Sequence, residues 1–173
     1  TIWPHEAYDF SKWLSHAENL SLLSDAVGIN MVLEELEPSV GSFSVDLFAK
    51  EEGTGRKIII ENQLEDTNHD HLGKIITYAS GLDASVIIWI VASAKEEHSS
   101  AIEWLNKHTD DEVSFFLIEV HAYTIENSKP APYFKIIQQP NDFVKQVKNI
   151  SKSSEMNDSQ KNRMEFWNKF NEV

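Results

Sequence analysis

The stretch VDLFAKEEGTGRKIIIENQLED, residues 45–66, decides the fold, because it has the pattern of two strands joined by a short turn. Gly53 and Gly55 can supply the positive φ that tight hairpin turns require. Two acids, Asp46 and Glu61, lie among strongly apolar neighbours on the two predicted strands. The first question is therefore what these carboxylates do on strands that otherwise favour burial.

The register of this hairpin determines which polar side chains meet. A two-residue turn at Gly53–Thr54 would place Asp46 opposite Glu61, and a turn at Thr54–Gly55 would place Asp46 opposite Gln63. Because strand side chains alternate between faces, both registers put Asp46, Glu61 and Gln63 on one face. A turn with an odd number of residues would break this arrangement.

Directly opposed carboxylates repel each other, since their Cβ atoms would lie about 4.5–5.5 Å apart. A divalent cation removes the conflict, and carboxylate oxygens are the ligands that Mg²⁺ and Mn²⁺ prefer. We therefore expect Asp46 and Glu61 to be metal ligands. The alternative, two acids that face solvent on an exposed hairpin, is opposed by the three branched apolar residues that precede Glu61.

The rest of the chain predicts a mixed sheet flanked by helices, which is an α/β fold. Apolar spacing indicates helices, and short apolar or alternating runs indicate strands. We expect the first helix to end at Gly28, and a second helix to begin at Asp66 or Thr67 and to end at Gly81. The predicted helices are 9–28, 67–81, 95–109 and 141–150, and the predicted strands are 29–37, 42–49, 56–64, 85–92, 113–125 and 134–138.

Composition limits the classes of function. The chain has 173 residues, a formal net charge of −13 and no cysteine, which excludes a disulfide framework and thiolate chemistry. Its first residues lack the pattern of a signal peptide, so a cytoplasmic location is expected. Residues 129–173 hold 8 basic and 5 acidic side chains, a net of +3. We expect Lys145 and Lys148 in this region to contact nucleic-acid phosphates.

Two parts of the chain differ in composition. Residues 1–150 have the pattern of one α/β domain, whereas 151–160 are polar and rich in serine. After them, KNRMEFWNKFNEV has the apolar spacing of a short amphipathic helix. We interpret 151–173 as a linker and a short helix, which either packs back on the domain or begins a second one.

The motifs resemble a known superfamily. Asp46, a hairpin and then Glu61-x-Gln63 are similar to the PD-(D/E)XK nuclease superfamily, in a variant with glutamine in place of lysine. The segments WPHEAYDFSKWL, VGSFSVDLFA, IIIENQLEDTNHDHLGKIITYASGLDA, EEHSSAIEWLNKHT and PAPYF together resemble a family of uncharacterised bacterial proteins with an N-terminal nuclease-like domain. The resemblance covers roughly residues 3–145.

The resemblance implies a restriction-endonuclease-like core with Asp46 and Glu61 as catalytic metal ligands. Gln63 would occupy the position of the lysine that usually orients or polarises the attacking water. Because glutamine carries no charge, Lys74 on the next helix is the candidate for the missing cation. Glu6, Glu18 and Glu37 are candidates for an auxiliary acid, and Glu37, which precedes the hairpin, is preferred.

The helix at 67–81 carries two rows of side chains. Leu72, Ile75, Ile76 and Ala79 follow the spacing of a core face, and Thr67, His71, Lys74 and Tyr78 form a second row. We expect this second row to face the carboxylates, with His71 and Tyr78 as nucleic-acid contacts. A solvated surface row is the alternative. His69 and His71 cannot chelate one ion, because residues two apart on a helix point in different directions.

The predicted function is Mg²⁺- or Mn²⁺-dependent hydrolysis of phosphodiester bonds, with Asp46, Glu61, Gln63 and Lys74 as catalytic residues. Nucleic acid, above all DNA, is the expected partner, a homodimer is compatible with the resemblance, and no membrane partner is expected. The alternative is a nuclease-like module that binds nucleic acid or protein without catalysis, which the acidic net charge and the absent lysine favour. A serine or cysteine hydrolase has no support, since there is no cysteine and no Gly-x-Ser-x-Gly motif.

Overall fold

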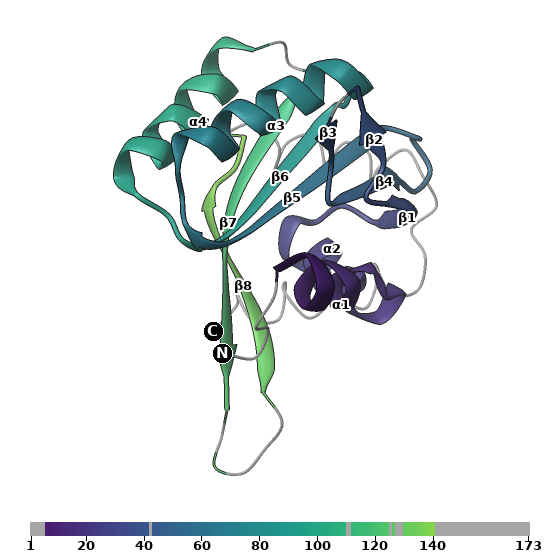
Figure 1. The fold of residues 1–173 in the computed structure, drawn as a ribbon, viewed down its shortest axis with the longest axis vertical. Helices are drawn as coiled ribbons and strands as arrows, with labels where there is room; N and C mark the ends of the chain where they lie inside the picture. The colour runs from purple at the N-terminus through teal and green to yellow at the C-terminus, as the bar shows by residue number, and fades with distance from the viewer. Residues whose placement is uncertain (1–5, 42, 110–111, 125, 127–129, 141–173) are drawn as a thin grey trace, which may run out of the picture. The chain divides into compact units, whose positions relative to one another are not determined.

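A mixed six-stranded sheet is the centre of the fold. The computed structural model describes residues 6–41, 43–109, 112–124, 126 and 130–140. Strands β5, β6 and β7 are parallel, and the other neighbours in this sheet are antiparallel. The order across the sheet is β1 (Met31–Leu36), β4 (Leu47–Glu51), β5 (Lys57–Asp66), β6 (Val86–Ser93), β7 (Ser114–Tyr123) and β8 (Ala131–Gln138) (Figure 1).

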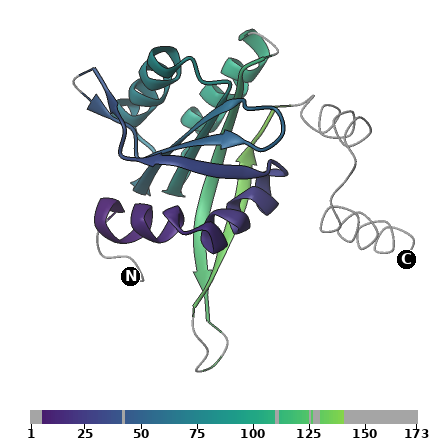
Figure 2. The same cartoon turned by 90° about the vertical axis from the view of Figure 1, so that its right-hand side faces the viewer.

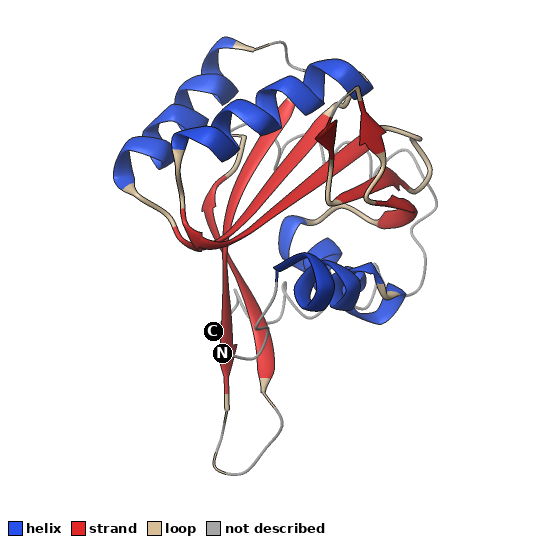
Figure 3. Cartoon of the chain, in the orientation of Figure 1, coloured by secondary structure: helices blue, strands red, loops and turns tan. Residues whose placement is uncertain are grey.

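Helices cover both faces of this sheet, as Figure 3 shows by colour. Helices α3 (His69–Leu82) and α4 (Glu96–His108) lie on one face, and η1 (Glu6–Ser11), α1 (Lys12–Ser15) and α2 (Ala17–Val27) lie on the other. A small second sheet pairs β2 (Ser39–Val40) with β3 (Phe43–Ser44). The predicted α/β class, with a mixed sheet flanked by helices, is confirmed.

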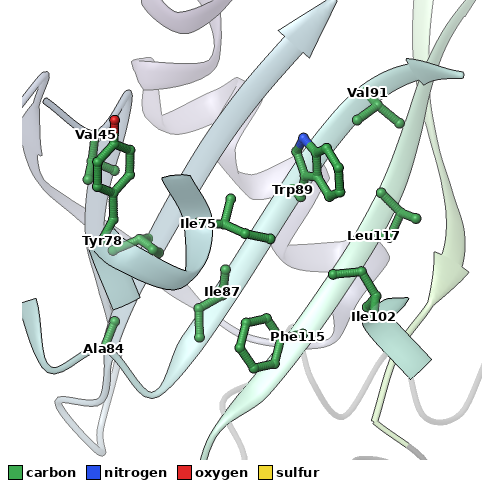
Figure 4. Packing of buried hydrophobic residues seen from close by; sticks show 11 residues of the cluster. Val45, Ile75, Tyr78, Ala84, Ile87, Trp89, Val91, Ile102, Phe115 and Leu117 are labelled. Carbon is green, nitrogen blue, oxygen red and sulfur yellow. The ribbon is translucent and has the colours of Figure 1, made fainter. Parts of the chain in front are cut away.

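The main core lies between the sheet and helices α3 and α4. Side chains of β5, β6 and β7 meet side chains of both helices there, because parallel strands covered on two faces carry apolar residues at nearly every position (Figure 4). All six positions of β6 from Val86 to Val91 are fully buried. The buried members of this core are Val45, Ile59, Ile75, Tyr78, Ala84, Ile87, Trp89, Val91, Ile102, Phe115 and Leu117.

The hairpin of β4 and β5 has the first of the two predicted registers. Leu47 pairs with Ile60 and Phe48 with Ile59, and β4 begins at Leu47, so Asp46 lies just before the paired strand. The turn is wider than predicted: the Glu51 N–H donates to the Arg56 carbonyl at 2.9 Å, which leaves 52–55 as the loop. Because this loop has an even number of residues, Glu61 and Gln63 lie on the same face of β5 as Ile59, as predicted.

Several element boundaries differ from the prediction. The first predicted helix is broken at His16, which is extended with φ −71° and ψ 134°, although Gly28 does end α2 with φ 72°. The predicted strand 42–49 is divided into β3 and β4, and Figure 2 gives a second view of this edge. The last predicted strand, 134–138, is longer and begins at Ala131.

Helix α3 begins and ends later than predicted. Its N-cap is Asn68, whose side-chain oxygen accepts from the His71 N–H at 2.9 Å, so neither Asp66 nor Thr67 caps it. Asp83, with φ 53°, follows the last helical residue, and Gly81 lies within the helix. Ile76 was predicted to face the core but is 43% exposed, and Tyr78 is buried instead.

Some predictions fall outside the described residues. These are the helix at 141–150, the linker and short helix at 151–173, and the phosphate contacts of Lys145 and Lys148. In the part of the chain that the structure describes, no helix is both long enough and apolar enough to cross a bilayer.

Candidate active site

The candidate site lies where β4 begins and β5 is most buried. Residues 59, 61 and 63 of β5 alternate onto the face covered by α3, since Ile59 belongs to the core beneath that helix. Glu61 is only 4% exposed and follows three isoleucines that are fully buried. Asp46 is partly exposed and comes directly before β4, whose first residue, Leu47, pairs with Ile60. The charges of both carboxylates reach the Tyr78 hydroxyl, so the two acids lie in one neighbourhood.

The negative charges of both carboxylates reach one side chain of α3, Tyr78. Burial raises the pKa of the Tyr78 hydroxyl, and the negative charges of Glu61 and then Asp46 raise it further. Tyr78 projects from α3 into the core beside Val45, the residue before Asp46 (Figure 4). Of the predicted second row, Tyr78 thus faces the acids as expected. Its position is buried, which differs from that of an exposed nucleic-acid contact.

The backbone around Asp46 is held from two sides. Asp46 Oδ2 accepts from the Asn62 N–H at 2.6 Å, which ties the carboxylate across to β5. The Asp46 carbonyl accepts from the Glu37 N–H at 2.9 Å. Glu37 is therefore a backbone neighbour of Asp46, with an exposed side chain and a positive φ of 54° that is uncommon for a residue other than glycine. Its role as an auxiliary acid stays a prediction.

Asn62 points to the opposite face of the sheet. Its side-chain Nδ2 donates to Ser11 Oγ at 2.8 Å, and both residues are fully buried. This bond joins β5 to η1 on the far side of the sheet from Glu61. Glu61 and Gln63 thus lie on the α3 face of β5, and Asn62 between them lies on the opposite face.

Gln63 has a more enclosed position than its predicted role suggests. It is 1% exposed, its Nε2 donates to the Asp66 carbonyl at 2.7 Å, and its Oε1 accepts from the Trp89 indole N–H at 3.2 Å. The predicted interaction of Gln63 with a water remains a prediction.

Lys74 and His71 lie on the same helix as Tyr78. Lys74 is half-buried, and among the described residues no ion pair joins its Nζ to Asp46 or Glu61. Burial lowers the pKa of His71, and the positive charge of Lys74 lowers it further. The His71 ring also hydrogen-bonds Asn68 Oδ1 at 3.1 Å. The catalytic role of Lys74 stays a prediction.

Sequence reasoning missed a buried polar group at the carboxyl ends of β5 and β6. His98 of α4, 3% exposed, hydrogen-bonds Thr67 Oγ1 at 2.7 Å through Nδ1 and His69 Nδ1 at 2.9 Å through Nε2. Burial lowers the pKa of His98, and the neighbouring His69 lowers it further. His98, Ile102 and Leu105 have helical core spacing, which is the signal that could have predicted this burial.

The donor set near Asp46 and Glu61 suits a hard cation. Mg²⁺ is commonly held by one or two carboxylates, with water and substrate oxygens completing its shell. Among the described residues, no group of three His, Cys, Asp or Glu side chains gathers around one point. The chain would therefore contribute two carboxylates, from Asp46 and Glu61, and leave the other positions open.

Comparisons with known proteins identify no family. No protein-family model matches the chain, and no curated protein matches it.

Similar solved structures do exist. An EndoMS–dsDNA2 complex has 14% identity and a TM-score of 0.45, covering 55% of this chain and 39% of that one. A repair endonuclease from Pyrococcus abyssi has 14% identity and a TM-score of 0.45, covering 62% and 46%. SfsA from Pyrococcus furiosus in complex with Ca²⁺ has 18% identity and a TM-score of 0.40, covering 73% and 60%.

This chain thus spans less than two thirds of the length of each of these three structures. At such identities the similarity concerns the fold alone.

Proposed function

We propose that this protein is a metal-dependent nuclease that hydrolyses phosphodiester bonds of nucleic acid, with DNA as the first candidate substrate. The observation that carries the proposal is that the carboxylates of Asp46 and Glu61 both lie near one group of α3, the Tyr78 hydroxyl. Burying a carboxylate is costly unless charge or hydrogen bonds compensate it, and two such groups together cost more. Their proximity is typical of a site that holds Mg²⁺ or Mn²⁺.

Each residue has a distinct part in the proposed site. Asp46 and Glu61 hold the cation, and the bond from the Asn62 N–H fixes the orientation of the Asp46 carboxylate. When bound, the cation would lower the pKa of a water and offset negative charge on the phosphate. Gln63 positions water or phosphate by hydrogen bonding, Lys74 supplies positive charge, and Glu37 is an auxiliary acid.

A second candidate function is a nuclease-like module that binds nucleic acid or protein without cleavage. The enclosure of Gln63 favours it, because the side chain is only 1% exposed and each polar atom of its amide already has one partner. It also agrees with the absence of a lysine at that position. The two candidate functions differ in whether the protein cleaves nucleic acid: the nuclease cleaves through its carboxylates, and the module only binds.

The test is a cleavage assay on single- and double-stranded DNA and RNA, with Mg²⁺ and with Mn²⁺. Asp46→Asn and Glu61→Gln remove one charge each with little change of shape. Each should lower the cleavage rate by roughly 10²- to 10³-fold or more, as is typical when one group that stabilises transition-state charge is lost.

The matched control is Glu52→Gln, an exposed acid in the loop of the same hairpin. It should retain the wild-type rate. Cleavage that survives Asp46→Asn would indicate a contaminating nuclease. If the wild-type protein binds nucleic acid but no metal elicits cleavage, the binding module is the better description.

A further inference from the structure

The side-chain amide of Gln63 is held in one orientation by two partners of opposite character. The indole N–H of Trp89 can only donate, so the atom that faces it at 3.2 Å is Oε1. The Asp66 carbonyl can only accept, so the atom that faces it at 2.7 Å is Nε2. Rotating the amide by half a turn would set donor against donor and acceptor against acceptor, which fixes the orientation.

His98 contacts Trp89 and the residue after Asp66, the two residues that hydrogen-bond Gln63. Trp89 is fully buried, and the His98 ring meets its indole edge-on, with ring centres 5.9 Å apart. His98 also hydrogen-bonds Thr67, the residue that follows Asp66. One histidine thus supports both the donor and the acceptor of the Gln63 amide.

The amide still has capacity for a further partner. A glutamine amide has two N–H donors and two acceptor positions on oxygen, and the two contacts use one of each. Gln63 lies two residues from Glu61 and therefore shares its face of the sheet. The enclosure consequently leaves one N–H and one acceptor position with a defined direction.

We propose that Trp89 is a positioning residue for the reaction of the Asp46–Glu61 site, acting through the amide of Gln63. The inference rests on the proposed nuclease function and extends it. With the indole N–H in place, Gln63 offers a fixed donor and acceptor to water or phosphate. Without it, only the Asp66 carbonyl orients the amide, so the restraint on the position of the donor and acceptor is weaker.

The position is built for an amide, which explains why a glutamine can take the place of a lysine. A lysine ammonium has donors only, so it would face the Trp89 N–H without an acceptor between them. A buried ammonium would also lose its hydration. Trp89 and Gln63 therefore form a matched pair on adjacent parallel strands.

The experiment removes the N–H of Trp89 and keeps an aromatic side chain at that position. The two variants are Trp89→Phe and the replacement of Trp89 by benzothienylalanine, which has sulfur in place of N–H and nearly the indole shape. Cleavage should fall about 10- to 100-fold in kcat, since misplacing a positioned group has an effect of this order. KM and the affinity for Mn²⁺, measured by calorimetry, should stay within twofold of wild type.

The control is Ile87→Val, a buried position on the same strand and the same face as Trp89. It lowers stability without touching the amide, so kcat should be unchanged. A purely structural role for Trp89 would lower kcat in this variant as much as in Trp89→Phe at equal loss of stability. If Trp89→Phe does not fold, the benzothienylalanine variant decides the matter.

Each outcome separates this inference from the proposed function. Wild-type cleavage with unchanged kcat in both Trp89 variants overturns the positioning role and leaves the nuclease intact. No cleavage by the wild-type protein, with Mn²⁺ or Mg²⁺ and any nucleic acid, overturns both. A loss of kcat together with a loss of Mn²⁺ affinity also overturns the positioning role, because the metal ligands would then be disturbed.

Discussion

Two glutamates on the same face of the sheet have opposite surroundings. Glu119 of β7 accepts from the Ala94 N–H at 3.0 Å, from His121 at 3.1 Å and from Lys135 at 3.3 Å. Burial alone would raise the pKa of Glu119, but these three hydrogen bonds together lower it. Glu61 of β5 instead lies near another carboxylate, Asp46, since the charges of both act on the Tyr78 hydroxyl.

This difference separates a structural acid from a candidate ligand. At Glu119 the fold supplies the positive charge and the donors, so the carboxylate fastens the loop after β6 to β7. At Glu61 the neighbouring charge has the same sign, and a cation from solution would relieve it. We therefore expect the two sites to respond differently to mutation, to metal and to pH.

The largest expected effect comes from placing a lysine beside Glu61, as Lys135 lies beside Glu119. Gln63→Lys should lower the free energy of unfolding by up to about 3 kcal/mol, because an ammonium cannot accept and leaves the buried Trp89 N–H without a partner. Urea denaturation at pH 7 measures this. Combining it with Trp89→Phe should recover part of the loss, and a fully additive double mutant would contradict the proposed pairing.

The second largest effect is the stabilisation by bound metal, which should depend on Glu61 and not on Glu119. At a Mn²⁺ concentration about 100-fold above Kd, binding to the folded state stabilises it by about 2.7 kcal/mol. Thermal denaturation should show this increase for wild type and for Glu119→Gln. Glu61→Gln should lose it, and a metal response that persists in Glu61→Gln would remove Glu61 from the site.

Without metal, neutralising Glu119 should destabilise the protein more than neutralising an acid of the candidate site. Glu119→Gln should lower the free energy of unfolding by about 1–3 kcal/mol at pH 7, since it weakens hydrogen bonds to a charged group. Asp46→Asn should cost little or stabilise the protein, because it removes a like-charge contact and keeps an acceptor for the Asn62 N–H. Equal losses in the two variants would contradict the comparison.

The Glu119 effect should depend on pH with a definite sign. Its pKa is lower in the folded protein than in the unfolded chain. The stabilisation is therefore complete above the unfolded value of about 4.3, and it is lost as the pH falls through the folded value. Denaturation curves for wild type and Glu119→Gln should converge below that range, and a constant difference would argue against an ionic origin.

The smallest effect concerns a buried base. The pKa of His98 is lowered, first by burial and then by His69. The unfolded chain therefore binds more protons just below pH 6.5, so wild type should lose stability as the pH falls from about 6.5 toward the folded value. His98→Asn should show a shallower slope between pH 7 and 5. The exposed His108→Asn is the control, and the two slopes should differ.

The hairpin and its acids were predictable because their signal is local. The parity of a strand depends only on counting residues, so either register with an even loop brings Asp46 and Glu61 to one face. The apolar run of β6 is equally local, and its burial on both faces follows from its composition. The boundaries of α3 were less predictable, since Asn68 and Asp83 took the end positions through their own hydrogen bonding and backbone conformation.

The surroundings of each acid could not be predicted from the chain order. The apolar run before each acid does not distinguish Glu119 from Glu61, since both follow such runs on predicted strands. Their difference depends on Lys135, which is 16 residues from Glu119, and on the backbone of Ala94, which is 25 residues away. These contacts form only when β6, β7 and β8 lie side by side.

By itself the sequence determined the α/β class, the strand face that carries Asp46, Glu61 and Gln63, and the absence of thiolate chemistry, because composition and periodicity act over a few residues. Tertiary structure alone decided that Trp89 holds the Gln63 amide and that His98 meets Thr67 and His69. The physical reason is that a hydrogen bond requires its two atoms within about 3.5 Å at a suitable angle. Only the packed sheet and helices bring residues so distant in the chain to that separation.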